Sequence, residues 1–232
     1  MPVLNPTVSG QIASATSPNH ATARDATAGT FNGSSSRYAS GVQYTALSSL
    51  RGNSYTITRY FIEFDTSGIT VAPTDATLSL HGFTNGGADL FVVKADFSDG
   101  SIGNGDFDSI DGWTAGADNS SNVTKYSSEI TTWNTSAFND ITLNSTALSD
   151  IGSSGTRFKV CLIQADNDLP NVDGLGLFQQ TGFWRTFNTI HLDYTEGTAA
   201  GYGHKVLGVA AANIGKINGV ATANIGKVNG VD

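Results

Sequence analysis

The clearest alternation of apolar and polar residues falls on one run, Arg-Tyr-Phe-Ile-Glu-Phe-Asp-Thr-Ser. It places Tyr60, Ile62 and Phe64 on one face of a strand and Phe61 and Glu63 on the other, because successive side chains of a strand point to opposite faces. Aromatic and β-branched residues are also typical of strands. We therefore expect this run to be the strand around which the fold is organised.

A second alternating run, residues 76–81, follows after a break at Gly68 and Pro73. Leu78 and Leu80 recur there at every second position, again as in a strand. We predict that the two runs pair as the central strands of an antiparallel sheet.

Strand-like runs occur along most of the chain, and no stretch has a convincing helical period. The remaining runs are residues 7–14, 42–50, 55–58, 89–94, 129–133, 139–144, 157–163, 174–178 and 189–194. The nearest approach to a helix is residues 145–151, which would form one short turn. Many short strands with glycine-rich turns predict an all-β fold, a jelly-roll-like two-sheet antiparallel β-sandwich.

The pattern divides the chain into three parts. Residues 1–30 are an extended N-terminal arm or a first strand, residues 31–197 hold the β-sandwich domain, and residues 198–232 form a glycine-rich repeat tail. Within the domain, residues 96–122 make a loop far longer than usual. Such a length indicates either a functional segment or a packed excursion.

The tail repeats itself at an offset of 11 residues, since Ala-Asn-Ile-Gly-Lys-Ile-Asn-Gly-Val at 212–220 recurs at 223–231 with one Ile replaced by Val. Two glycines in each copy oppose a helix, and Asn-Gly between β-branched residues is typical of a hairpin turn. Short repeats bury little surface alone, so we expect the tail to become ordered only against another surface. The residues expected to mediate assembly are Lys205, Ile214, Lys216, Ile217, Val220, Ile225, Lys227, Val228 and Val231.

The net charge of −8 is unevenly distributed. Residues 1–197 hold 9 Lys and Arg against 19 Asp and Glu, whereas the tail holds three lysines and one acid, Asp232. An acidic body disfavours binding to nucleic acid or to anionic membranes. The mildly basic tail is suited to dock on an acidic neighbour, including another copy of the same body.

No arrangement of residues typical of an enzyme occurs. Cys161, the sole cysteine, lies in an apolar run and is expected to be a buried structural thiol. The four histidines show no metal-ligand or triad spacing, and no phosphate loop or dinucleotide fingerprint is present. A glycosidase would need a facing pair of carboxylates, which a sequence cannot reveal, and nothing else indicates one. We expect no catalytic residues and no enzymatic activity.

The first residues, Met-Pro-Val-Leu-Asn-Pro, contain no basic region followed by an apolar core, and no run is long enough to span a membrane. We therefore expect synthesis in a host cytoplasm without a signal peptide, and no membrane insertion. The richness in Gly, Ser, Thr and Asn is nevertheless typical of extracellular modules. A virion protein, made inside a cell and released by lysis, would reconcile both features.

Several motifs within residues 55–194 carry a resemblance to known proteins. They are RYFIEFDTS, DATLSL, DF followed by DFDSIDGW, NDITLN and IHLDY. In order and spacing they resemble β-sandwich modules of bacteriophage virion proteins, found more distantly in secreted bacterial proteins beside carbohydrate-active domains. The tail is similar to IGKVNGV segments at the ends of phage structural and fibre proteins. The resemblance implies a jelly-roll-like sandwich without enzymatic activity, and it covers capsid-decorating, fibre and glycan-binding roles alike.

Two groups of oxygen-bearing side chains are candidate calcium ligands, because alternate positions in a loop can direct hard oxygen ligands at one cation. They are Asn104, Asp106, Asp108 and Asp111 in the long loop, and Asp166, Asp168 and Asp173 further on. The first group departs from an EF-hand loop, with Ser109 where glycine is needed and no glutamate at the twelfth position. Turns in which Asx side chains cap their own backbone explain both groups equally well.

Four large aromatic residues are candidates for a platform on which sugars stack. They are Trp113, Trp133, Trp184 and Tyr126. The alternative is that these rings close the ends of an apolar core.

These features favour a non-enzymatic structural protein of a phage-like virion, a capsid decoration or a fibre component that assembles through its terminal segments. Its expected partners are further copies of itself, as a homo-oligomer such as a trimer, and other virion proteins. The alternatives are a carbohydrate-binding adhesion module that recognises surface glycans, and the subunit of an extracellular filament. No cofactor is expected apart from the calcium considered above.

Overall fold

The computed structural model describes residues 1–33, 40–153, 157–184, 189–198, 216–217 and 220–221. The chain forms two compact units, Met1–Glu196 and Gly197–Asp232, here called the body and the tail.

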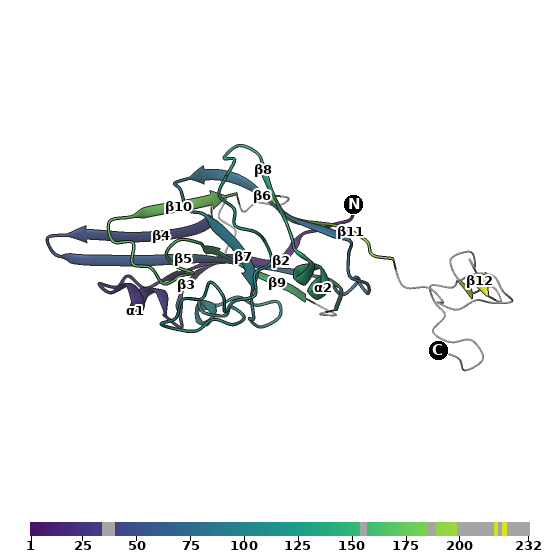
Figure 1. Cartoon of the computed structure of the whole chain (residues 1–232), viewed down its shortest axis with the longest axis horizontal. Coiled ribbons are helices and arrows are strands. Elements are labelled where there is room, and N and C mark those ends of the chain that lie inside the picture. The colour runs from purple at the N-terminus through teal and green to yellow at the C-terminus, as the bar shows by residue number, and fades with distance from the viewer. Residues whose placement is uncertain (34–39, 154–156, 185–188, 199–215, 218–219, 222–232) are drawn as a thin grey trace. The chain divides into compact units, whose positions relative to one another are not determined.

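The body is built mainly of antiparallel strands (Figure 1). They are β1 (Val3–Leu4), β2 (Pro6–Ser14), β3 (Gly29–Asn32), β4 (Ser40–Ser49), β5 (Gly52–Asp65), β6 (Asp75–Asn85), β7 (Leu90–Lys94), β8 (Phe138–Thr142), β9 (Arg157–Gln164), β10 (Phe178–Phe183) and β11 (Ile190–Thr195). Two short α-helices, α1 (His20–Arg24) and α2 (Ser145–Ser153), and a 3-10 helix, η1 (Asn104–Asp106), complete the elements of the described body. The predicted all-β class and antiparallel pairing are confirmed.

β5 is the strand around which the body is organised, as the alternation predicted. It is 14 residues long and pairs with β2, β4 and β9. β4 pairs with β5 as far as Thr58, and β9 pairs with it from Tyr60 onward. The N-terminal segment, for which an arm or a first strand was expected, lies in the sheet as β2, between β5 and β3.

The predicted pairing of the two strongest runs is wrong. In the described strands β6 pairs not with β5 but with β11, β8 and β10. Local alternation shows which residues form a strand, but the choice of neighbour depends on contacts between distant segments, which a local pattern does not encode.

The two faces of β5 belong to two separate apolar clusters, which confirms the predicted assignment of faces. Tyr60, Ile62 and Phe64 join a first cluster with buried residues of β6, β7, β8, β9 and β11. Phe61 joins a second cluster that includes buried residues of β4, β7 and β9. In Figure 1, β6 and β8 lie on one side of β4 and β5, and α1 and the long loop lie on the other.

The long loop at residues 96–122 is a packed excursion, one of the two predicted alternatives. Phe97, Ile102, Phe107 and Ile110 are buried in the second cluster. Burying one such side chain stabilises the fold by about 1.5–3 kcal/mol. The loop therefore serves as the cover of one face of the sheet.

Several local predictions differ from the structure. α2 has nine residues rather than one turn, and its Ala147 and Ile151 pack into the first cluster. α1 was not predicted, although the Asn19 side chain accepts from the Thr22 N–H as a helix cap. Residues 129–133 are not a strand, and residues 174–177 are a turn that precedes β10.

In the tail the structure describes two short antiparallel strands, β12 (Lys216–Ile217) and β13 (Val220–Ala221). Ile217 lies opposite Val220, so only the Asn-Gly dipeptide separates the strands in sequence. This antiparallel pairing agrees with a turn at Asn-Gly, although the two turn residues lie outside the described ones. A hairpin of two-residue strands is too short to be stable in water by itself.

Candidate functional site: the free edge of β8

β8 forms an edge of the sheet, and two hydrogen bonds show which of its residues face its partner β6. The Gly82 N–H donates to the Ala137 carbonyl at 2.9 Å, and the Leu143 N–H donates to the Ala76 carbonyl at 2.9 Å. In an antiparallel ladder the hydrogen-bonded pairs alternate with non-hydrogen-bonded pairs. The odd-numbered residues of β8 therefore direct their backbone groups toward β6.

The backbone groups of Phe138, Asp140 and Thr142 consequently point away from the sheet. Among the described strands β8 pairs only with β6. Its outer edge is a row of backbone donors and acceptors of the kind on which a further strand can pair.

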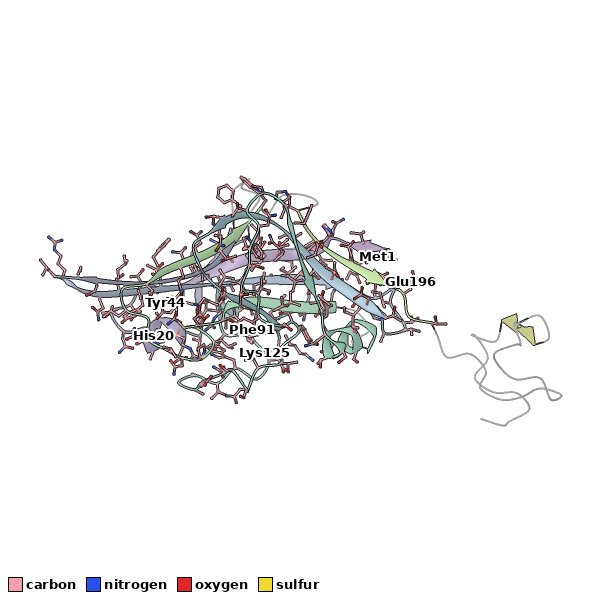
Figure 2. All side chains as sticks on the ribbon, turned by 45° about the horizontal axis from the view of Figure 1, so that its top comes forward. Met1, His20, Tyr44, Phe91, Lys125 and Glu196 are labelled. Atoms are coloured by element: carbon pink, nitrogen blue, oxygen red, sulfur yellow. The ribbon has the colours of Figure 1, made fainter. Side chains whose placement is uncertain are left out.

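Two other edge strands of the described sheet, β3 and β7, have contacts along their outer edges. At β3 the Phe31 N–H donates to the Asn104 side chain at 2.8 Å. At β7 the isolated bridge between Val93 and Lys125 covers the edge, and the Lys125 ammonium lies 4.3 Å from the centre of the Phe91 ring (Figure 2). β8 has five residues, and no described strand pairs with its outer edge.

A groove of about 520 Å³ runs along this edge. Residues 138–144 form one wall, and residues 127–130 with Thr132 form the other. The volume lies within the range of ordinary binding pockets. The groove occupies the position that a further strand beside β8 would take.

The far wall of the groove is fixed by backbone hydrogen bonds. Ile130 and Leu90 exchange two bonds, at 2.8 and 3.1 Å, and the Tyr126 N–H donates to the Val92 carbonyl at 2.8 Å. At one end of the groove the Asn144 N–H donates to the Tyr126 carbonyl at 2.8 Å. Backbone hydrogen bonds to β7 therefore fix one wall of the groove, and pairing with β6 fixes the other wall.

The opposite end of the groove is closed by an amide pair. The Asn134 N–H donates to the Asn139 side-chain oxygen at 2.7 Å, and the Asn139 amide donates back to the Asn134 carbonyl at 2.9 Å. The distance between the walls is thus set at both ends.

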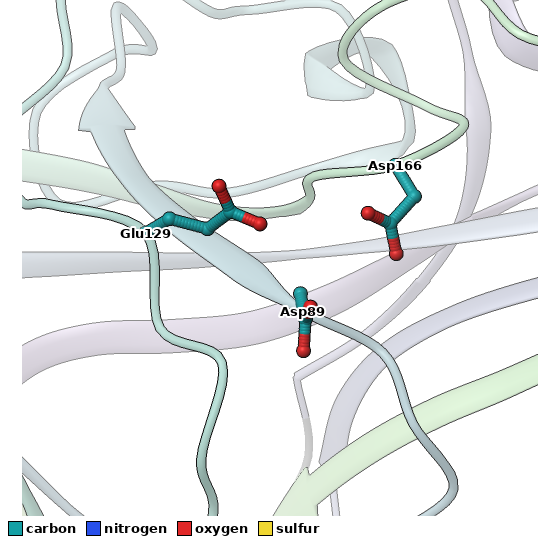
Figure 3. A group of neighbouring side chains, drawn as sticks. All are labelled: Asp89, Glu129 and Asp166. Atoms are coloured by element: carbon teal, nitrogen blue, oxygen red, sulfur yellow. The ribbon is translucent and has the colours of Figure 1, made fainter.

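The groove is acidic. Its titratable side chains, Glu129 and Asp140, are exposed, and its lining contains no lysine or arginine. Glu129 also belongs to a cluster with Asp89 and Asp166, whose carboxylate oxygens lie within 4.8 Å of one another (Figure 3). Burial, and then the nearby charge of Asp89, raises the pKa of Asp166. Such a set of oxygens is of the type that binds hard cations, and it makes this end of the groove strongly negative.

A shallow hollow of about 410 Å³ lies on the outer face of the same strands. The Ser79 hydroxyl donates to Asp140 at 2.7 Å and lies 3.4 Å from Asp193, whose other contact is His191 Nε2 at 3.0 Å. Phe138 is 40% exposed, and its ring centre lies 4.9 Å from that of His191. The hollow therefore combines an aromatic face with fixed carboxylates.

This polar group differs from a hydrolase triad. Ser79 is 2% exposed and donates to carboxylates, whereas a catalytic serine donates to an imidazole.

Three of the four predicted platform residues belong to the two apolar clusters, and the fourth, Trp184, lies outside them. Trp113 packs against the second cluster, and Trp133 packs against the first. Tyr126 is 1% exposed within the first cluster, and its hydroxyl donates to Asp150. Trp184 is half-buried, and its ring centre lies 4.4 Å from that of Phe83, an exposed side chain. The four rings therefore do not form one shared face.

Trp113 covers a buried ion-pair network. The Arg59 guanidinium donates to both carboxylate oxygens of Asp168, at 2.7 and 2.8 Å. It lies 4.0 Å from the Trp113 ring centre and 4.2 Å from that of Phe107. Arg24 lies over the same tryptophan at 4.3 Å, and burial lowers its pKa. The aromatic rings exclude water from these charges, so Trp113 has a packing role here.

The predicted calcium ligands of the long loop have protein donors as partners. Asn104 accepts from the Phe31 N–H, Asp106 accepts from the Gly103 N–H at 2.7 Å, and Asp111 accepts from the Thr124 hydroxyl at 2.8 Å. Asp108 is half-buried. Calcium binding by this loop stays a prediction, and the alternative of turns capped by Asx side chains describes the contacts of Asp106.

The second predicted group is divided among different partners. Asp168 is paired with Arg59, Asp173 accepts from the Tyr55 hydroxyl at 2.9 Å, and Asp166 lies with Asp89 and Glu129. Among the described residues, this last set is the one group of three acidic side chains close enough to share an ion.

Of the predicted assembly residues, Lys216, Ile217 and Val220 lie in β12 and β13. The others lie outside the described residues. They are Lys205, Ile214, Ile225, Lys227, Val228 and Val231.

Cys161 is fully buried, as predicted, and burial raises the pKa of its thiol. His81 and His191 are half-buried within β6 and β11, and each makes a polar contact. His20 lies beside the Tyr44 ring (Figure 2), and burial lowers its pKa. These contacts agree with structural roles.

The free edge itself was missed. The sequence pattern of β8 was recognised as a strand, but an edge strand and an inner strand alternate in the same way. The one available signal was the lack of proline and lysine in Phe138–Thr142, two residues that commonly protect edges.

Within the described residues, no helix has both the length and the apolar character needed to cross a lipid bilayer. In comparisons with known proteins, no family model matches the chain, and no curated protein matches it.

Proposed function

We propose that this chain is a non-enzymatic structural protein that assembles through its terminal segments, as a capsid decoration or fibre component of a phage-like virion. The observation that carries the proposal is the division of the chain into a body and a separate tail. Both apolar clusters lie entirely within the body, so the body has a core of its own. The described tail hairpin is too small to be stable alone, and a partner surface would supply the missing contacts.

The virion setting rests on the resemblance of residues 55–194 and of the IGKVNGV tail to phage structural proteins. A jelly-roll-like sandwich belongs to this proposal. It is supported by the first apolar cluster, which β6, β8 and β11 share with β5, β7 and β9.

The solution mass tests the proposal. Light scattering should give a trimer or another oligomer for the full chain and a monomer for residues 1–197. An equal mass for both would contradict assembly through the tail, and the circular dichroism spectrum of residues 1–197 would check that the body is folded.

Glycan binding is a second candidate function, and the hollow around Phe138 favours it. A sugar could stack on the exposed ring and donate hydroxyl hydrogen bonds to Asp140 and Asp193, since flat aromatic faces and fixed polar groups together orient such ligands. A glycan array with Phe138→Ala and, as a control, Phe178→Ala, another exposed aromatic, would test it. Binding that is lost in both variants or in neither would argue against this hollow.

A further inference from the structure

We propose that the groove along β8 accepts a tail repeat from a second copy of the chain, added as a strand to the free edge. This inference rests on the proposed function and names the surface on which the tail assembles. About five residues of the repeat would lie between β8 and residues 127–132, so that the sheet gains one short strand, and the rest of the repeat would leave over the open side of the groove, because hydrogen bonds join the two walls at both ends.

The backbone of the groove is suited to a strand. Phe138, Asp140 and Thr142 direct their N–H and carbonyl groups into it, and the opposite wall is fixed by the bonds of Ile130 to Leu90. Addition of a strand at such an edge draws affinity from main-chain hydrogen bonds. The added segment therefore needs an extended backbone without proline, and its side chains matter less.

The tail repeat meets this requirement. Each clear repeat has nine residues, which extend to about 30 Å, more than the length of five-residue β8. It contains no proline, and a third of its residues are β-branched, a type that favours extended backbone, although they recur at every third position rather than on one strand face. Its glycines allow the close approach of backbone that a walled groove demands.

The charges of the two surfaces are complementary. Each clear repeat carries one lysine, Lys216 or Lys227, and the tail's single acid is its last residue. The groove presents Glu129 and Asp140, with Asp89 and Asp166 beside Glu129. A lysine opposite a carboxylate on a neighbouring strand is a favourable cross-strand pair.

A second copy is the donor that this arrangement favours. The tail of each chain forms a compact unit of its own. Each chain has a groove that can accept a tail and a tail that it can donate. Copies can therefore join through the same contact repeatedly around a symmetry axis.

A charge exchange between full-length chains tests the inference. Glu129→Lys with Asp140→Lys makes the groove basic, and Lys216→Glu with Lys227→Glu makes the tail acidic. Each double variant alone should associate at least about tenfold more weakly than the natural chain in light scattering at low salt. A mixture of the two should recover association, because each groove then meets a tail of opposite charge. Asp75→Lys with Asp96→Lys, exposed acids that do not line the groove, is the matched control and should associate normally.

Thr142→Pro is an independent test of the backbone contact. It removes an N–H that points into the groove and leaves the bonds from β8 to β6 in place. Association should weaken strongly, whereas Thr142→Ala, which keeps the N–H, should associate as the natural chain does. If the proline variant does not fold, the charge exchange decides.

The outcomes separate this inference from the proposed function. If removal of residues 198–232 abolishes assembly but neither the charge exchange nor Thr142→Pro affects it, the tail docks elsewhere and this inference is wrong. If the truncated chain assembles normally, the proposed function itself is wrong. A full-length chain that stays monomeric at every concentration would overturn docking between copies. A tail that fills the groove of its own chain would give this monomeric result.

Discussion

The Arg59 network and the edge of β8 are both polar, but the hydrogen-bonding groups of the first are buried and paired, whereas those of the second face a groove. Arg59 and Asp168 are fully buried, and the guanidinium has a partner on each nitrogen. At β8 the outward backbone groups of three residues face a groove, and the nearby acids are exposed. The first region is complete within one chain, whereas the second has the geometry of a region that is completed by a partner.

This difference indicates where substitutions will affect stability and where they will affect assembly. Buried charges need all their partners for the chain to fold. Exposed groups at an edge are hydrated in the free protein, so changing them costs little stability. The predictions below go from the largest expected effect to the smallest.

The largest expected loss is for Asp168→Ala, which leaves Arg59 buried without its carboxylate. Removing one partner of a buried ion pair costs about 3–5 kcal/mol, so much of the population should unfold at moderate urea concentration. The free energy of unfolding from urea denaturation measures it. Glu129→Ala, an exposed acid on the other wall of the groove, should change that free energy by less than about 1 kcal/mol. If both variants lost the same free energy of unfolding, the proposed difference between the buried network and the edge of β8 would be wrong.

A smaller loss is expected for Asn144→Ala, at the end of the groove. The Asn144 side chain accepts from the N–H groups of Thr146 and Ala147, both at 3.1 Å, and so caps α2. Loss of such a cap costs about 1 kcal/mol. The thermal midpoint by circular dichroism is the measurement, with Ser149→Ala, on the exposed side of α2, as the control. An unchanged midpoint for Asn144→Ala would show that the cap does not stabilise α2.

The smallest effect concerns the acidic cluster. A folded-state pKa that is raised, as for Asp166, contributes stability below the unfolded value of 3.8 and loses it as pH rises through the folded pKa. Asp166→Asn cannot ionise, so it should be more stable than the natural chain at pH 7 but not at pH 3.5. The gain should stay below about 1 kcal/mol, because solvent screens an exposed group.

Asp118→Asn should change the stability at pH 7 in the opposite direction to Asp166→Asn. Hydrogen bonds from Ser120 lower the pKa of Asp118, so its contribution is present at neutral pH and lost as pH falls. This variant should be less stable than the natural chain at pH 7. If both asparagine variants shift the thermal midpoint in the same direction at pH 7, the electrostatic account of the cluster is wrong.

The sequence predicted the strands better than their neighbours. The alternation of Tyr60, Ile62 and Phe64 identified β5 and assigned its faces, because burial on two sides leaves a local trace. The partners of β5 and β6 were not predicted, because they come from segments far away in the chain. The length of α2 was also underestimated, since its apolar face is narrow and only packing against the first cluster stabilises it.

The candidate site was less predictable for the same reason. Asp168 was assigned to a group of loop acids, but its partner Arg59 lies 109 residues earlier in the chain. Asp89 and Glu129 were not singled out, because three loops bring them to Asp166 only in the folded body. The tail was different, since the Asn-Gly signal of its hairpin is local and was recognised from sequence.

The most direct test is amide hydrogen exchange at the outward-facing residues of β8, compared between the full chain and residues 1–197. If a tail from another copy lies along this edge, the amides of Phe138, Asp140 and Thr142 should exchange slowly in the assembled full chain and fast in the truncated body. The amides of Asn139 and Ile141, which face β6, should be protected in both. Equal and fast exchange of the three outward amides in both proteins would contradict strand addition at β8.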